Sequence, residues 1–442
     1  MTSEVVFSSS VSGVPPSTGR WKRYPAYRDS GVEWLGEIPE HWEVKRLKFA
    51  ARLNMGQSPS SEDYNLDGEG PPFLQGNAEF GPKHPNPKLF CATAVKHAQE
   101  GDLLLSVRAP VGAVNIADQR YGIGRGLCAL TPERSSLANE YLWYLVHVTR
   151  VGLNAVSTGS TYEAVANHAV ACMRMVLPPL PEQRAIADFL DREAAKIDAL
   201  VAKRERLVDL LQEKRAAVIA NAVTKGLDPN APMRDSGIAS LGKIPAHWEV
   251  RRNKQIFREV DERSTTGEEE LLTVSHITGV TPRSEKEVYM FLAESMEGYK
   301  KVRKDDLVVN TMWAWMGALG ISGLDGIVSP SYNVYRASSG YEPMYLDFLY
   351  RTPPYVCEIG RYSKGVWSSR LRLYPDEFFE IWTITAPLSE QKAIVAHIAA
   401  EIQPIDALIA EVRAHIDKLR EFRMALISAV VTGKIDVREE AA

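Results

Sequence analysis

The sequence holds few cysteines, and their spacing pairs none of them. Its 442 residues include only four, namely Cys91, Cys128, Cys172 and Cys357. None belongs to a CxxC pair, and no histidine-rich segment accompanies them. This distribution argues against a structural zinc site, against any other resident metal and against a disulfide framework. It is typical of a protein in a reducing cytoplasm, which is the location we expect.

An excess of positive charge is also missing. The formal net charge is −4, so the chain as a whole is not a basic nucleic-acid-binding protein, and any contact with DNA must come from local patches. We find no uninterrupted apolar run of membrane-spanning length and no signal peptide, so we expect no membrane association. With 45% hydrophobic and 24% charged residues, the composition predicts two to four globular domains.

Catalytic motifs are incomplete wherever they begin. Thr352–Tyr355 resembles the Asn/Asp-Pro-Pro-Tyr motif of adenine methyltransferases, but threonine replaces the group that accepts the adenine amino hydrogens. The glycines of Gly122–Gly126 lack the Rossmann spacing and a Walker lysine, which favours a backbone turn. Pro375–Glu377 lacks the downstream Glu-x-Lys of nucleases. The sequence therefore predicts a protein without catalytic activity or a cofactor of its own.

What the sequence does contain is a long amphipathic helix, predicted from Pro181 to Thr224. Apolar residues recur every seven positions at Leu190, Ile197, Leu211 and Val218, and only Arg204 interrupts the row. A second apolar row runs beside the first, as in a coiled coil. Such a stripe is too apolar to face water, so the helix needs a partner.

The same helix occurs a second time. Glu182-Gln183 corresponds to Glu390-Gln391 at an offset of 208 residues, and the apolar row continues through Ile398, Ile405 and Leu419. Because each copy presents one apolar stripe, the simplest partner for each helix is the other. We therefore expect the two helices to pack as an antiparallel coiled coil.

An opening motif is repeated as well. Residues 28–46 (RDSGVEWLGEIPEHWEVKR) match residues 234–252 (RDSGIASLGKIPAHWEVRR) at an offset of 206. Trp42 and Trp248 recur at the same place in this motif, which favours a structural role at the joint between domain and helix. Mixed strands, turns and short helices, among them Glu140–Val151 and Met344–Arg351, are predicted between opening motif and long helix. The fold class is therefore α+β, with two tandem pseudo-symmetric halves.

These repeats define five segments. We expect a flexible tail at 1–20, a first variable domain at 21–178, a first long helix at 179–226, a linker with a second variable domain at 227–386, and a second long helix with a tail at 387–442. The last segment echoes the end of the first helix, since Gly433 follows it as Gly226 follows the first. The repeat then closes on itself, and the chain ends should lie close together.

The doubled motifs resemble one known family. The opening motif, the Leu-Pro/Ser-Glu-Gln helix start, and the segments Gly56–Pro59, Pro72–Gly76 and Ser106–Gly112 are similar to those of the specificity subunit of type I restriction–modification systems. The resemblance covers nearly the whole chain after residue 20. The second variable region departs from it, with Trp313-Ala314-Trp315 where the first has Arg108-Ala109-Pro110.

The resemblance implies a non-catalytic DNA-recognition subunit with two target recognition domains, each reading one half of an asymmetric, bipartite double-stranded DNA target. It implies that the long helices form a spacer and dock two methyltransferase subunits, which carry S-adenosylmethionine, and that restriction subunits using ATP and Mg²⁺ can join. Residues assigned to these docking helices are Glu182, Gln183, Ile197, Leu211, Glu390, Gln391, Ile405 and Leu419.

Candidate DNA contacts are basic or hydroxyl-bearing residues in predicted loops, since arginine suits guanine and lysine suits phosphate. In the first domain they are Lys83, His84, Arg108, Arg125, Ser160, Thr161 and Tyr162. In the second they are Arg283, Lys286, Lys300, Lys301, Lys304, Lys364, Ser368, Ser369 and Arg370. Trp313 and Trp315 could stack on bases, although packing in the core is the favoured interpretation.

Other functions stay open on the sequence alone. One is a structural adaptor that bridges proteins and touches no DNA, which the acidic balance would fit. Another is the recognition subunit of a related restriction–modification class. A self-contained methyltransferase or nuclease is disfavoured by the missing cofactor loop and by Thr352. The sequence gives neither the target bases nor the spacing between them.

Overall fold

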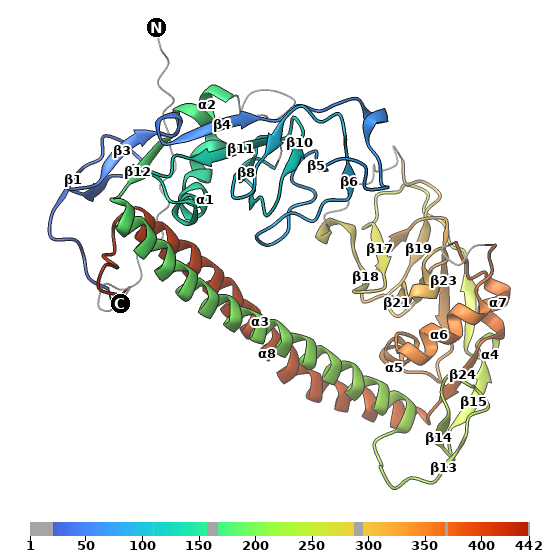
Figure 1. Cartoon of the computed structure of the whole chain (residues 1–442). Coiled ribbons are helices and arrows are strands. Elements are labelled where there is room, and N and C mark those ends of the chain that lie inside the picture. Colours follow the sequence, from blue (N-terminus) through green and yellow to red (C-terminus); the bar gives the residue numbers. More distant parts are fainter. Residues whose placement is uncertain (1–20, 109, 157–166, 287–294, 367–369, 441–442) are drawn as a thin grey trace. The chain divides into compact units, whose positions relative to one another are not determined.

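The computed structural model describes residues 21–108, 110–156, 167–286, 295–366 and 370–440, with side chains of 150–156 and of 167 left aside. The tail expected at 1–20 lies outside these ranges. The chain forms two compact units: Met1–Arg204 with Ala414–Ala442, and Glu205–Arg413. Each unit is described separately below, and the ribbon is shown in Figure 1.

The first unit is built on a four-stranded antiparallel sheet. Its strands run in the order β4 (Ala51–Met55), β11 (Leu127–Pro132), β8 (Leu103–Ser106) and β9 (Val114–Ile116). Because side chains alternate along a strand, Leu103 and Leu105 of β8 join one apolar cluster and Leu104 joins another. Both faces of the sheet are therefore covered.

The two faces are covered by different elements. Helix α1 (Asn139–Val156) supplies Tyr141, Leu142 and Leu145 to the first cluster. On the other face lies a smaller sheet in the order β6 (Leu89–Phe90), β5 (Pro72–Leu74), β10 (Tyr121–Ile123) and β7 (His97–Ala98), where only the β5–β10 pair is parallel. Short helical turns complete this unit: η1 (Leu47–Phe49), η2 (Ser61–Asp63) and α2 (Asn167–Cys172).

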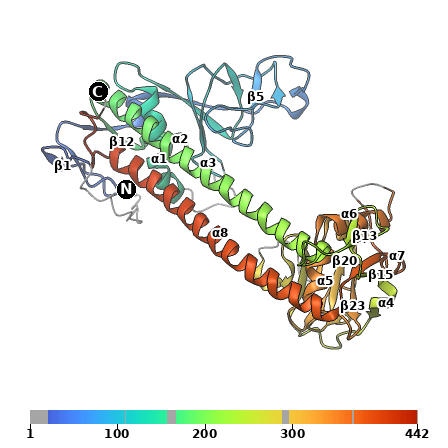
Figure 2. The ribbon, with the colours of Figure 1, turned by 90° about the horizontal axis from the view of Figure 1, so that it is seen from below.

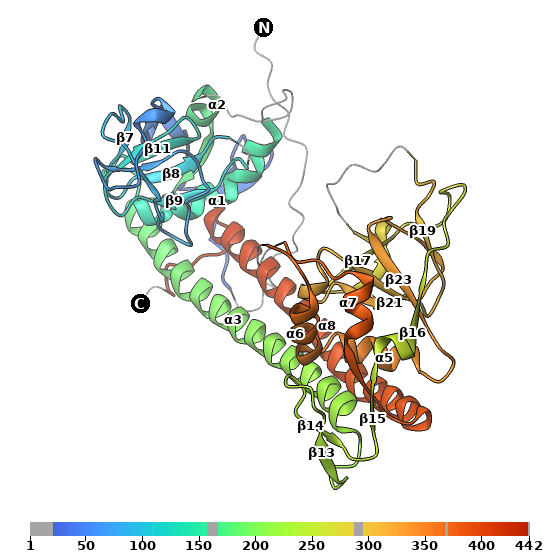
Figure 3. The ribbon, with the colours of Figure 1, turned by 90° about the vertical axis from the view of Figure 1, so that its right-hand side faces the viewer.

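The second unit repeats the central sheet. Its order is β16 (Phe257–Val260), β23 (Tyr332–Ala337), β20 (Leu307–Asn310) and β21 (Leu319–Ile321), again wholly antiparallel. Leu307 and Val309 of β20 pack with the helices α5 (Pro343–Tyr350), α6 (Pro353–Tyr362) and α7 (Pro375–Glu380), which Figure 3 shows grouped near β21 and β23. Val308 packs on the opposite side with residues of two small two-stranded sheets.

Those two-stranded sheets replace the smaller sheet of the first unit. They are β17 (Leu272–Ser275) with β18 (Gly279–Pro282), and β19 (Lys300–Val302) with β22 (Gly326–Val328). The remaining short helices are α4 (Asn253–Ile256), η3 (Arg283–Glu285) and η4 (Ala314–Met316). The helices expected at Glu140–Val151 and Met344–Arg351 are confirmed as α1 and α5.

The opening motifs fold alike. In the first unit, β1 (Tyr27–Asp29) pairs with β2 (Glu37–Pro39), and β3 (Glu43–Arg46) pairs with β12 (Arg174–Leu177). In the second unit, β13 (Met233–Asp235) pairs with β14 (Lys243–Pro245), and β15 (Glu249–Arg252) pairs with β24 (Trp382–Thr385). Arg28 donates to the Trp42 carbonyl at 2.6 Å, and Arg234 donates to that of Trp248 at 2.6 Å. The residues that the two opening motifs share thus form the same hydrogen bonds in both copies.

Helices α3 (Leu180–Lys225) and α8 (Leu388–Val431) form the antiparallel pair that the heptads predict, and Figure 2 shows them side by side. In the first unit, Ile186 and Leu190 near the start of α3 share a cluster with Leu426 and Val430 near the end of α8. In the second unit the relation is reversed, since Ala222 and Val223 of α3 pack with Ile394 and Ile398 of α8. The expected fold class is confirmed, while the segment boundaries chosen from the sequence stay a prediction.

Helix α8 departs from expectation in one respect. By length and composition alone it is apolar enough to cross a membrane, contrary to our expectation that no segment would be. A core helix of a soluble protein can pass the same test when it is mostly buried; here the seam residues Ile398, Ile405 and Val412 are buried, while only 22% of the apolar window is. Pro404 lies within the helix and cannot donate the backbone hydrogen bond to residue 400.

The two ends of the described chain, near residues 22 and 436, meet in the first unit, as predicted. The Asp436 amide donates to the Lys22 carbonyl at 2.9 Å, and the Tyr27 hydroxyl donates to the Gly433 carbonyl at 3.0 Å. Gly433 follows α8 with φ = +74°, and a Cβ there would lie 2.3 Å from Pro39 Cδ and 3.0 Å from the Trp42 ring. A glycine is therefore needed both for the backbone conformation and for the close packing.

Replacing this glycine should test the joint. We expect Gly433→Ala to destabilise the first unit by roughly 2 kcal/mol more than Gly31→Ala, because Gly31 has a similar φ of +67° but nothing within 4 Å of its Cβ position. Urea unfolding of the full chain, followed by tryptophan fluorescence, measures the difference. Equal losses in the two variants would show that the contact with Pro39 and Trp42 contributes little.

Candidate nucleic-acid interface

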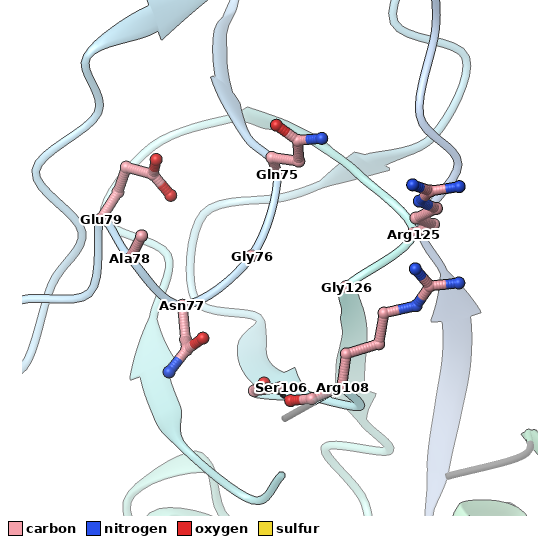
Figure 4. Close-up of a pocket in the computed structure, with 9 residues that line it drawn as sticks. All are labelled: Gln75, Gly76, Asn77, Ala78, Glu79, Ser106, Arg108, Arg125 and Gly126. Atoms are coloured by element: carbon pink, nitrogen blue, oxygen red, sulfur yellow. Dashed lines mark hydrogen bonds between the residues drawn. The ribbon is translucent and has the colours of Figure 1, made fainter. Parts of the chain in front are cut away.

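A hollow in the first unit is lined by two of the arginines that the sequence analysis had singled out. Its volume is 310 Å³, and Figure 4 shows Arg108 and Arg125 on one side, with Asn77 and Glu79 across from them. Gln75 lies at its rim. The remaining lining residues are Gly76, Ala78, Ser106 and Gly126.

Glycines let three segments converge on this hollow. A Cβ on Gly124 would lie 2.9 Å from Gln75 Cα, and one on Gly126 would lie 2.7 Å from the Gln75 carbonyl oxygen. The Gly124 amide donates to the Leu74 carbonyl at 2.8 Å, and the Val107 amide donates to the Gly126 carbonyl at 2.9 Å. The cluster Gly122–Gly126 is therefore a close-packed backbone turn, as predicted, and it positions Arg125.

The loop after β8 positions Arg108. The Ser106 hydroxyl contacts the carbonyl oxygens of Arg108 and Pro110 at 2.8 and 3.1 Å, and Gly112 closes the loop with φ = +85°. On the other side, the Arg125 amide donates to the Ser58 hydroxyl at 3.1 Å. Both guanidinium groups are therefore carried by backbone that is fixed by hydrogen bonds.

The charges in this hollow are unpaired. Among the described residues, neither Arg108 nor Arg125 forms an ion pair, and both side chains are exposed. One carboxylate oxygen of Glu79 is buried and has no hydrogen-bond partner. The hollow thus has strong donors on one side and the Glu79 carboxylate on the other, a combination suited to polar groups of a ligand.

Sequence reasoning found the two arginines but missed Gln75, Asn77 and Glu79. Gln75 belongs to the segment Pro72–Gly76, which carried part of the resemblance, so a signal for it was present. Lys83 and His84 are exposed on the loop that follows Glu79, and His84 Nδ1 lies 3.0 Å from the Ile116 carbonyl oxygen. They do not line the hollow. Ser160, Thr161 and Tyr162 lie outside the described residues.

In the second unit, two candidates were placed wrongly. Lys300 and Lys301 lie on strand β19 rather than in a loop. The Lys300 side chain is only 5% exposed because it packs against Asn333, with Nζ 3.2 Å from Oδ1. Several other cations are paired with the chain's own carboxylates. Lys301 Nζ is 3.0 Å from Glu269, and Lys364 pairs with Glu377, which raises the pKa of the lysine. Burial lowers the pKa of Lys286.

Three basic candidates of the second unit are exposed, Lys304, Lys364 and Arg370, and Lys364 is the one paired with Glu377. Arg283 belongs to η3 and is half-buried. Ser368 and Ser369 lie outside the described residues. The favoured interpretation of Trp313 as a core residue is wrong, because its side chain is 49% exposed, while Trp315 is half-buried.

The Glu-Gln pairs assigned to docking hold the fold together instead. Glu182 accepts hydrogen bonds from Trp42 Nε1 at 3.0 Å and from His41 Nε2 at 2.9 Å. Gln183 bonds Ala138, Ser136 and Pro178 through its amide, each at 2.8 Å. Both side chains are buried, so neither is available to a partner subunit.

The second copy behaves in the same way. Glu390 accepts from His247 Nε2 at 2.8 Å, and buried Gln391 bonds the backbone of Glu342 and Ala386 at 2.9 and 2.7 Å. Ile197 and Ile405 are buried in the helix seam, and Leu211 and Leu419 are partly buried. Docking by the helices stays a prediction, and their exposed faces, rather than the buried side chains among these eight, would have to provide it.

The residues that suggested catalysis are structural. The Thr352 hydroxyl donates to the Leu349 carbonyl at 2.7 Å, and the Tyr355 hydroxyl accepts from the Ile384 amide at 2.8 Å, and both residues are buried. Within the described ranges, no group of three or more His, Cys, Asp or Glu side chains is arranged to hold a metal ion.

Comparisons with known proteins agree with the resemblance. The family description "Type I restriction modification DNA specificity domain" matches residues 39–207. The putative type I restriction enzyme MjaX specificity subunit of Methanocaldococcus jannaschii is 37% identical over 40% of this chain and 44% of its own length. The MjaIX specificity subunit of the same organism is 25% identical over 51% of this chain. The chain therefore spans about half of each of these relatives, 44% and 53%.

Other similarities extend over most of the chain. The type I restriction enzyme EcoBI specificity subunit of Escherichia coli is 20% identical over 93% of this chain and 90% of its own length. A chain from a solved type I R-M system, described for its complex assembly and conformational transition, has the same fold, with a TM-score of 0.58 and 17% identity over 89% of this chain and 98% of its own. Residues 39–207 therefore match the type I restriction modification DNA specificity domain, and most of the chain is similar to a type I restriction enzyme specificity subunit.

Proposed function

We propose that the protein is the DNA-recognition subunit of a type I restriction–modification complex and that its two recognition domains each read one half of an asymmetric, bipartite target. The hollow that contains Arg108 and Arg125 is the observation that carries this proposal. Two unlike domains on matching joints would read two unlike half-sites, whereas identical readers would require a palindrome.

The hollow offers the groups that read a G·C pair in the major groove. Guanine presents two acceptors, O6 and N7, which a guanidinium group binds through two hydrogen bonds, and cytosine presents an amino donor, which a carboxylate accepts. Arg108 or Arg125 would supply the first and Glu79 the second. The remaining arginine and the exposed Lys83 would contact phosphates, which position the protein without reading sequence.

The assembly would follow that of the family. The exposed faces of α3 and α8 would dock two methyltransferase subunits, with restriction subunits joining them in the cytoplasm, and the paired helices would act as the spacer. S-adenosylmethionine, ATP and Mg²⁺ would then belong to those partners. Support for this division comes from Thr352, which packs in the fold and lacks the amide or carboxylate that an adenine methyltransferase needs.

Substitutions in the hollow should alter sequence reading. We expect Arg108→Ala to weaken binding to the cognate duplex by about 10- to 100-fold, because one bidentate contact contributes about 1–3 kcal/mol of discrimination. Arg108→Lys should keep non-specific binding yet lose much of the preference for the cognate half-site. Fluorescence anisotropy with the cognate and a scrambled duplex, at one fixed salt concentration, separates the two effects.

A matched control is Arg134→Ala, which removes the same charge from an exposed position beyond the other end of β11. It should leave the preference for the cognate half-site unchanged. If Arg134→Ala and Arg108→Ala weaken binding equally, the hollow is not the reading site. If the full chain binds no DNA, alone or with a methyltransferase subunit, the adaptor hypothesis is favoured instead.

The isolated chain should transfer no methyl groups. Tritium incorporation from labelled S-adenosylmethionine into DNA measures this, and addition of a type I methyltransferase subunit should restore it. Incorporation by the purified chain alone, at a rate that scales with its concentration, would contradict the division of roles.

The variable regions should be exchangeable. Replacing residues 47–178 with the corresponding region of a relative should change one half of the methylated sequence and leave the other unchanged, because the opening motif and the helix start supply the same joints in both halves. Sequencing of methylated DNA from cells that express the hybrid with a methyltransferase subunit gives the result. A change in both halves would show that the domains do not read independently.

A further inference from the structure

The internal repeat aligns one loop of each recognition domain. β8 and β20 hold the same place in the two central sheets, and the loops that follow them close in the same way. The Ser106 amide donates to the Ala113 carbonyl at 2.8 Å, and the Asn310 amide donates to the Ala318 carbonyl at 3.0 Å. Gly112 and Gly317 end these loops with φ values of +85° and +87°.

The two loops carry different chemistry. Where the first presents Arg108, the second, Thr311–Gly317, presents Met312, Trp313 and Met316, and we call it the tryptophan loop. Their side chains are 37%, 49% and 37% exposed. Trp313 and Trp315 stack with ring centroids 6.3 Å apart and an angle of 21° between the rings. The exposed surface is therefore apolar and aromatic.

The backbone of the tryptophan loop is fixed by buried and hydrogen-bonded groups. Ala314 is fully buried, the Met312 amide donates to Asn310 Oδ1 at 3.3 Å, and Trp315 Nε1 donates to the Met312 carbonyl at 3.1 Å. Since the Trp315 indole N–H is satisfied within the loop, it offers no donor to a ligand. Large apolar side chains that are fixed in contact with water cost free energy, which indicates a binding partner.

Positive charge lies beside this loop. The Leu373 amide donates to the Thr311 carbonyl at 3.0 Å, which ties the tryptophan loop to a segment with the exposed cations Arg370 and Arg372. An apolar patch flanked by cations is complementary to DNA, because the phosphates are negatively charged and the grooves between them expose apolar groups of the bases. In the DNA major groove, that apolar group is the C5-methyl of thymine.

We propose that the tryptophan loop is a base-reading element of the second domain and selects thymine by packing Trp313 and Met312 against its C5-methyl group. This inference rests on the proposed function and adds the base class that the second half-site contains. Arg370 and Arg372 would hold the flanking phosphates. The first domain would then read hydrogen-bonding groups and the second a methyl group, at equivalent places in the fold.

Deoxyuridine tests this directly, because it differs from thymine only by the missing methyl. The full chain is first selected on random duplexes to obtain its target, and each thymine of the second half-site is then replaced singly by deoxyuridine. We expect at least one replacement to weaken binding by about fourfold, as burial of one methyl group predicts. Trp313→Ala should weaken binding to the thymine duplex and abolish the difference between thymine and deoxyuridine at that position.

Leu324→Ala is the matched control, since Leu324 is a similarly exposed apolar residue beyond the other end of β21. It should keep the full thymine preference, and urea unfolding should show that Trp313→Ala is folded. A second half-site without a methyl-dependent thymine, or an unchanged preference in Trp313→Ala, would overturn the inference while DNA binding itself upholds the proposed function. Loss of methyltransferase-subunit binding in Trp313→Ala, with the thymine preference intact, would assign the loop to a protein partner and also overturn it.

Discussion

The architecture depends on one repeated contact, in which a tryptophan of the opening motif packs over the glycine that ends a long helix. The Trp42 ring would lie 3.0 Å from a Cβ on Gly433, and the Trp248 ring would lie 3.4 Å from one on Gly226. The start of the other helix joins each contact, since Glu182 accepts from Trp42 and Glu390 accepts from His247, the neighbour of Trp248. Each joint therefore fastens an opening motif, one helix start and one helix end. The copies differ in one detail, since Trp42 Nε1 donates to Glu182 whereas that of Trp248 is buried without a partner.

The shared joints and the differing surfaces fit a division of labour within each half. The central sheets and the opening motifs are equivalent in the two halves. So are two tyrosines that donate to a carbonyl at the end of a long helix: Tyr141 bonds Val431 of α8, and Tyr345 bonds Val223 of α3, each at 3.4 Å. What differs lies on the far face of each sheet and in the loops. The loop after β8 carries Arg108, whereas the equivalent loop after β20 carries Trp313. Such a change in recognition chemistry therefore does not alter the residues that stabilise the fold.

Periodicity and repetition were enough to predict most of this fold, because the apolar stripe of α3 and α8 is a local property of the sequence. The site was less predictable. Arg108 and Arg125 could be chosen by type, but Glu79 was missed because only the folded backbone brings it across from them. Lys300 was misplaced because its β19 segment is short and carries two lysines. Glu182 and Gln183 recur because they accept hydrogen bonds from an indole and from a backbone amide of the same chain. A sequence repeat alone cannot distinguish this role from docking to a partner.

The closure of the chain ends has a consequence for biosynthesis. The second unit is one continuous stretch, Glu205–Arg413, whereas the first unit needs Ala414–Ala442 in addition to residues up to Arg204. Leu426, Val430, Ile435 and Val437 belong to the apolar core of that first unit. On the ribosome, the domain that is made first therefore lacks part of its core until the last helix emerges, while the domain made second already has all of its residues. The domain that is synthesised first is therefore the one whose core is completed last. Until then, part of its apolar core surface stays exposed.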